Sequence, residues 1–175
     1  MANTYTLISS TTVGSGGASS IDFTSIPNTY TDLLIKISTR VDQAGAPNVC
    51  LRFNSDTGSN YKYKAAFGNG TSPGSYSEVD TGSTFMNLGY GDNSAHTANT
   101  FGSTDVIIPN YADSNYKLTT SESTMEDNNA TSYLMITSGY WNNTNAITSI
   151  TLFNQNSGYK WVQYTTASLY GIKKN

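Results

Sequence analysis

The chain has 175 residues, of which nine are Lys or Arg and twelve are Asp or Glu, and its net charge is −3 with a pI near 4.9. This length fits one domain of ordinary size. Because the charge supplies no basic field to attract a phosphate backbone, it disfavours nucleic acid as a partner. No stretch approaches the roughly 20 apolar residues that cross a bilayer as a helix, so we expect no membrane partner.

Only 12% of the residues are charged, about half of the roughly 25% found in average domains. The 13 Tyr, six Phe and two Trp argue against disorder, because disordered segments are poor in aromatic residues. Thr and Tyr favour strands, while Asn, Gly and Ser supply turns. The composition therefore indicates a β protein with many connections.

Alternation of apolar and polar residues, the pattern of a half-buried strand, recurs along the chain. The run over residues 20–29 indicates a short strand and a turn at Pro27-Asn28, which lead into a long strand over residues 33–41. Further strands are predicted over residues 5–9, 49–53, 61–67, 85–90, 105–108, 116–121, 133–136, 147–153 and 159–170. Turn signals such as Asp56-Thr57-Gly58 separate them. We predict an all-β fold: one antiparallel β-sandwich domain over residues 1–175, jelly-roll-like, with long loops.

The predicted core follows from the apolar face of each strand. Residues 133–136 are apolar on both faces, so we expect this strand to be central. The expected core residues are Leu33, Ile35, Ile37, Leu51, Phe53, Leu134, Ile136, Ile150 and Leu152.

The segment between Gly68 and Thr104 is rich in Gly and has little regular alternation. Long loops in compact domains are usually functional or mobile, so we interpret it as long loops with one or two weak strands. Exposed apolar residues in loops usually mark a partner surface. The predicted interface residues are Tyr76, Phe85, Met86, Leu88, Tyr90 and Phe101 from this segment, with Tyr140 and Trp141 from a later loop.

No catalytic residue, metal ligand or cofactor site is predicted, and we do not expect an enzyme. His96 has no evident partner to fix its tautomer, and we expect an exposed loop histidine. Cys50 lies within a predicted strand, which fits a small buried side chain. The acidic residues are scattered, mostly in turns where Asp bonds its own backbone.

Aromatic residues beside polar segments leave three interpretations open. Tyr90, Tyr140, Trp141 and Trp161 could form core, contact a protein partner, or stack on sugar rings.

Four motifs, in the same order along the chain, resemble a family of small structural proteins of tailed-bacteriophage particles. They are IDFTSIPxTYTDL (residues 21–33), LRFNxDTGxNY (51–61), ITSITLF (147–153) and ASLYGIK (167–173), where x is any residue. The resemblance covers both ends of the chain and skips residues 68–130.

The resemblance implies a structural component of the virion, made in the host cytoplasm and without catalytic residues. We expect a capsid decoration or cement protein, a homotrimer that binds the major capsid protein and stabilises contacts between its subunits. The alternative is a tail-fibre or receptor-binding protein of the virion that binds a host glycan. The absence of heptads and fibrous repeats favours the capsid over a fibre shaft.

Overall fold

The computed structural model describes residues 4–125 and 132–173, apart from the side chains of residues 76–81, and these residues form twelve β-strands and no helix. The strands are β1 (Tyr5–Thr12), β2 (Ser20–Phe23), β3 (Asp32–Thr39), β4 (Asn48–Phe53), β5 (Tyr61–Gly68), β6 (Pro73–Ser83), β7 (Met86–Tyr90), β8 (Gly102–Ile108), β9 (Lys117–Met125), β10 (Tyr133–Trp141), β11 (Ile150–Asn154) and β12 (Thr166–Ile172). Within the described residues, no helix is long and apolar enough to cross a membrane.

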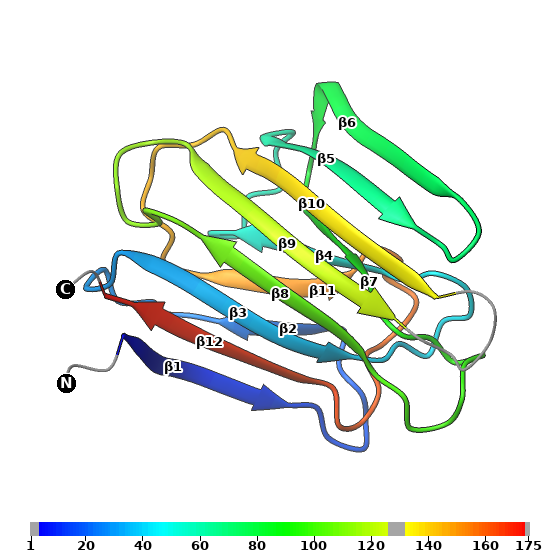
Figure 1. The fold of residues 1–175 in the computed structure, drawn as a ribbon. Helices are drawn as coiled ribbons and strands as arrows, with labels where there is room; N and C mark the ends of the chain where they lie inside the picture. Colours follow the sequence, from blue (N-terminus) through cyan, green and yellow to red (C-terminus); the bar gives the residue numbers. More distant parts are fainter. Residues whose placement is uncertain (1–3, 126–131, 174–175) are drawn as a thin grey trace.

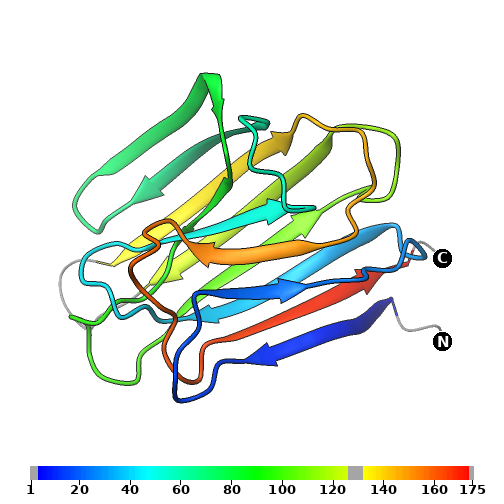
Figure 2. The same ribbon diagram turned by 180° about the vertical axis from the view of Figure 1, so that it is seen from behind.

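Two antiparallel sheets pack face to face. The larger has eight strands in the order β1-β12-β3-β8-β9-β10-β5-β6, and the smaller has four in the order β2-β11-β4-β7. Figure 1 shows the larger sheet in front, with β1 at one end and β6 at the other; Figure 2 shows the smaller sheet from the opposite side. The predicted antiparallel β-sandwich is confirmed, whereas the jelly-roll connections stay a prediction.

The core lies between the two sheets, where alternate residues of each strand point inward. Leu33, Ile35 and Ile37 of β3 are buried, as are Leu51 and Phe53 of β4. Ile150 and Leu152 of β11 complete the part of the predicted core that the structure confirms. Burial of such side chains stabilises the fold by about 1.5–3 kcal/mol each.

The prediction is wrong for Leu134 and Ile136, which are 50% and 51% exposed on the outer face of β10. Their neighbour Met135 is fully buried instead. A strand that is apolar on both faces fits either orientation by period alone, and a shift of one residue exchanges the faces. The far end of β10 settles the choice, because Trp141 shares the face of Met135 and is buried.

The segment from Gly68 to Thr104 contains two strands, β6 and β7, and a long connection over residues 91–101, which agrees with the predicted one or two strands and long loops, but β7 is far more buried than expected. β6 pairs with β5 at the end of the larger sheet, and β7 pairs with β4 in the smaller one. Met86 and Leu88 are fully buried and belong to the core. Weak alternation misled the prediction here, since all residues of β7 from Met86 to Gly89 are buried.

Candidate binding surface on the eight-stranded sheet

The outer face of the larger sheet is unusually apolar. Among the described residues, six large hydrophobic side chains in strands of this sheet are at least half exposed. They are Tyr5 and Leu7 of β1, Ile107 of β8, Leu118 of β9, and Leu134 and Ile136 of β10. Scattered exposed apolar residues are normal, but a group on one face marks an interaction site.

Strand register brings several of these residues into one row. Leu7 is opposite Tyr170 in β12, Tyr170 is opposite Leu34 in β3, and Leu34 is opposite Ile107 in β8. Directly opposite side chains on one face of a sheet touch one another. The row therefore forms a continuous apolar band across four strands.

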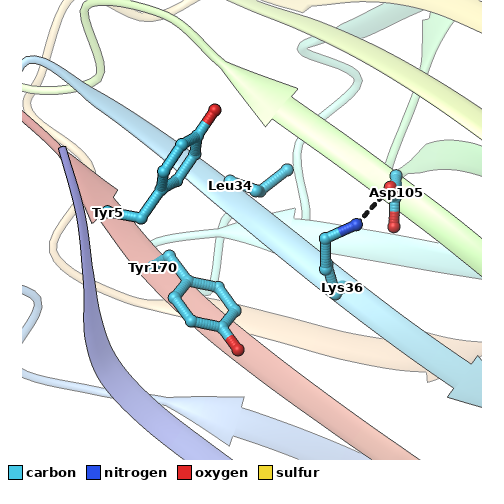
Figure 3. Close-up of a pocket in the computed structure, with 5 residues that line it drawn as sticks. All are labelled: Tyr5, Leu34, Lys36, Asp105 and Tyr170. Carbon is cyan, nitrogen blue, oxygen red and sulfur yellow. Dashed lines mark hydrogen bonds and ion pairs between the residues drawn. The ribbon is translucent and has the colours of Figure 1, made fainter.

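Two members of this row, Leu34 and Tyr170, also line a groove of ≈ 420 Å³ together with Tyr5, Lys36 and Asp105. Figure 3 shows the two tyrosine side chains beside Leu34, and Lys36 reaching Asp105. The Lys36 Nζ lies 2.6 Å from the Asp105 Oδ2, and both side chains are about half exposed. An ion pair this exposed contributes only about 0–1 kcal/mol, so both groups remain available to a ligand.

Asp105 also lines two neighbouring hollows, of ≈ 240 and ≈ 220 Å³. One is shared with Ser103, Glu122 and Thr124, and the other includes Ile107 and Ile136. Asp105 and Glu122 are opposite one another on β8 and β9. Around Asp105 the face thus combines apolar and aromatic contact area with two carboxylates and one ammonium group, and further along it Lys62 and Lys64 lie opposite Tyr140 and Ser138. This chemistry suits binding of a partner.

The outer face was missed in the sequence because its members alternate with core residues. Leu34 and Lys36 stand between the buried Leu33, Ile35 and Ile37 of β3. Nothing in such a strand indicates which exposed residues of distant strands meet. Only the order of the strands in the sheet brings Tyr5, Leu34 and Asp105 together.

Three predicted interface residues lie in the core rather than at a surface. Met86, Leu88 and Trp141 are buried, and the Trp141 ring packs against Phe53 with ring centroids 5.6 Å apart. Trp141 Nε1 donates a 2.6 Å hydrogen bond to Asp56 Oδ2. Trp161 is likewise buried. Neither tryptophan can offer a ring to a sugar.

The other predicted interface residues are distributed over the molecule. Phe85 is half-buried with its ring edge-on to Phe153, and Phe101 is half-buried. Tyr90 packs edge-on against Tyr133, with centroids 5.1 Å apart. Tyr140 stacks on Tyr116 at 6.1 Å and lies at the edge of the outer face. Tyr76 lies in β6, but its side chain is outside the described residues.

His96 does have a partner, contrary to the prediction. Its Nδ1 hydrogen-bonds with Asp92 Oδ1, its Nε2 lies 2.7 Å from Asn93 Nδ2, and the side chain is only 9% exposed. The clue was Asp92, four residues earlier. Because both ring nitrogens are engaged, we interpret His96 as part of a structural network.

Asp92 and Arg40 form the centre of that network. The buried Asp92 carboxylate lies 3.3 Å from the Arg40 Nη1. Arg40 also donates to the carbonyl oxygens of His96 (3.0 Å), Thr97 (2.8 Å) and Thr100 (3.0 Å). These hydrogen bonds from one guanidinium group therefore hold the long connection between β7 and β8 against the sandwich.

Cys50 is buried in β4, as predicted, and burial raises the pKa of its thiol far above the usual range. The thiol therefore stays protonated and unreactive in the folded protein. In the described part of the chain, no three His, Cys, Asp or Glu side chains are grouped so that they could hold a metal ion.

Comparison with protein families, with curated proteins and with solved structures found no match for this chain.

Proposed function

We propose that this protein is a non-enzymatic structural protein of a tailed-phage particle. In this proposal it lies on the head as a decoration or cement protein and stabilises contacts between subunits of the major capsid protein. The four motifs shared in order with small phage virion proteins support the class of protein. The apolar outer face of the eight-stranded sheet is the observation that carries the proposed mode of action.

The outer face suits a protein partner because of its exposed apolar and aromatic side chains. Interface centres are enriched in aromatic residues. Around Ile136, the cross-strand neighbours are Glu122 on one side and Ala66 on the other. Leu118 lies opposite Tyr140, which stacks on Tyr116. Covering these groups would stabilise a complex by roughly 25 cal/mol for each Å² of apolar surface that is removed from water.

Imaging of intact particles by electron cryo-microscopy tests the location. We expect density for the sandwich on the capsid shell, with the outer face of the larger sheet against the major capsid protein. Density on the tail alone would contradict the cement role and favour receptor binding.

A pair of variants tests the surface. Ile136→Glu places a charge at the centre of the outer face, where we expect it to abolish incorporation into particles without unfolding the protein. Tyr159→Glu adds the same charge at a tyrosine that is 43% exposed outside the sheets, and it should be incorporated normally. Equal incorporation of both variants would contradict the proposed contact surface.

A second candidate function is glycan binding, and the groove of Figure 3 favours it. Sugars present apolar C–H faces and hydroxyl groups together. The rings of Tyr5 and Tyr170 offer apolar contact area, while Lys36 and Asp105 offer a hydrogen-bond donor and acceptors. A volume of ≈ 420 Å³ falls in the range of small-ligand sites.

A glycan array followed by calorimetry tests this candidate. Tyr170→Ala should weaken any binding at least tenfold, whereas Tyr159→Ala, the removal of an exposed tyrosine remote from the groove, should leave it unchanged. Binding that survives Tyr170→Ala, or no binding to any glycan on the array, would remove this candidate.

A further inference from the structure

The four edges of the two sheets differ in how they are protected against pairing with another chain. A free edge presents unpaired N–H and C=O groups, and natural proteins block it with short strands, charges, prolines or cover. In the described part of the molecule, the edges are β1 and β6 of the larger sheet and β2 and β7 of the smaller one.

Three of these edges are blocked. β2 has four residues and carries the exposed Asp22. β6 begins with Pro73, and its sequence contains Glu78 and Asp80.

The edge of β7 is covered by the other sheet. Ser121 Oγ donates to Leu88 O at 2.8 Å, and Tyr90 N donates to Ser123 Oγ at 3.2 Å. Hydroxyl groups of β9 thus satisfy the backbone of β7, so no strand can be added there.

β1 has no charge, proline or cover; its pairing with β12 shifts register once, between Leu7 and Ser9, and is regular from Ser9 to Thr12. Its eight residues, Tyr5–Thr12, include no charged residue and no proline, and none of them is buried. Two of its large side chains, Tyr5 and Leu7, are 56% and 55% exposed. Figure 1 shows β1 uncovered at the end of the larger sheet. The regular, uncharged and uncovered part of this edge, from Ser9 to Thr12, is a template for another strand.

The hydrogen bonds to β12 indicate which backbone groups are available. Val13 N donates to Thr165 O at 2.8 Å, and Thr12 is opposite Thr166. In an antiparallel ladder, residues alternate between those that bond to the neighbour and those that face away. Ser10 and Thr12 therefore direct their N–H and C=O groups toward solvent at the free edge.

We propose that β1 pairs in antiparallel orientation with β1 of a second copy of this chain, which joins two eight-stranded sheets into one. Residues 10–12 form the centre of the seam, where Ser10 of each copy exchanges backbone hydrogen bonds with Thr12 of the other. The twofold arrangement needs only one surface patch, which complements itself. Two neutral strands meet without like charges directly opposite one another.

This inference does not rest on the proposed function, and the twofold pair differs from the homotrimer expected from the resemblance. Two variants of the edge test it. Ser10→Pro removes an N–H that faces away from β12, so the existing ladder is kept while the seam loses a donor. Thr12→Lys places a charge beside the seam. Thr120→Lys is the matched control, because Thr120 is an exposed threonine of the internal strand β9.

Light scattering coupled to size exclusion should give the unaltered protein twice the chain mass of 18.8 kDa at high concentration, falling on dilution. Ser10→Pro and Thr12→Lys should shift this equilibrium at least tenfold toward monomer, while Thr120→Lys should not. Circular dichroism and thermal unfolding establish that each variant is folded. In hydrogen exchange, the Ser10 and Thr12 amides should be protected only in the pair.

Three results would overturn the proposal. One is a monomer at every concentration. Another is a trimer or dimer whose mass is unchanged by both edge variants. The third is protection of the Ser10 and Thr12 amides only on particles, which would assign the edge to a strand of another protein.

Discussion

Gly89 of β7 and Ser123 of β9 are in direct contact across the interior of the sandwich. A Cβ added to Gly89 would lie 1.9 Å from Ser123 Oγ and 2.6 Å from Ser123 Cβ. Gly89 also has a φ of +127°, a conformation that residues with a Cβ rarely adopt. The two sheets approach this closely because a glycine on one strand faces a serine on the other.

Gly89→Ala should therefore destabilise the protein by about 2–4 kcal/mol, because it combines overpacking with backbone strain. Chemical denaturation measures the loss. Gly14→Ala is the control: a Cβ at Gly14 would meet nothing within 4 Å, and the change should stay within about 0.5 kcal/mol. An equally small effect at Gly89 would mean that the two strands are not in contact as described.

The polarity of the inward residues decides which strands could be predicted from the sequence. Strands such as β3 and β4 bury one apolar face, so alternation indicated both their position and their inward residues. On β9, the inward residues include Thr119, Ser121 and Ser123, which are small enough to lie against β7. A polar interior beside an apolar exterior reverses the usual pattern. On β10, Leu134, Met135 and Ile136 are all apolar, so period alone left its orientation open and sequence reasoning placed Leu134 and Ile136 inside.

Polar contacts between residues far apart in the sequence could not be predicted either. Lys117 is fully buried at the start of β9, and its Nζ donates to the carbonyl oxygens of Asp113 (2.6 Å) and Thr144 (3.2 Å). Burial lowers the pKa of this amine, since desolvation disfavours its charged form. Its two loops are far apart in sequence, and no local pattern predicts that one ammonium group joins them. The outer-face groove is hidden in the same way, because its residues come from β1, β3, β8 and β12.

The orientation of β10, with Met135 inside and Ile136 outside, can be tested with these two adjacent residues. Met135→Ala removes a fully buried side chain and should cost about 2–5 kcal/mol. Ile136→Ala removes a side chain that is half exposed and should change the free energy of unfolding by about 0.5 kcal/mol or less. Urea denaturation of both variants measures the difference. The reverse order of the two effects would show that the strand lies in the other register.

Among the described residues, Lys or Arg forms two ion pairs with Asp, and these differ in burial. They should therefore differ in how much they contribute to the free energy of unfolding. Arg40→Met leaves the buried Asp92 carboxylate without its cation and frees the carbonyl groups that the guanidinium holds. We expect a loss of about 3–5 kcal/mol. Lys36→Met breaks the exposed pair with Asp105 and should cost about 1 kcal/mol or less.

Denaturation measures both losses, and hydrogen exchange locates the first. Amides of the connection between β7 and β8, residues 91–101, should lose protection in Arg40→Met but keep it in Lys36→Met. Similar costs for the two variants would contradict the central role of the guanidinium in this connection.

The contact between Asp56 and Trp141 predicts how stability depends on pH. Burial by itself would raise the pKa of the Asp56 carboxyl, but hydrogen bonds from Trp141, Asn60 and Gly58 together outweigh it and hold the pKa below the ordinary 3.8. A carboxyl whose pKa is lower in the folded state binds protons more readily when unfolded. Its contribution is therefore present above about pH 4 and is lost as the pH falls through the folded-state value.

The free energy of unfolding should decline below about pH 4, and Asp56→Ala should reduce the steepness of that decline. At neutral pH the same variant should cost about 1–3 kcal/mol, because it leaves the buried Trp141 Nε1 without its acceptor. Glu122→Ala removes an exposed glutamate of β9 and serves as the control, with a decline below pH 4 as steep as that of the unaltered protein. Thermal unfolding between pH 2 and pH 7 measures all three proteins, and parallel profiles for Asp56→Ala and the unaltered protein would contradict the assigned role of this carboxylate.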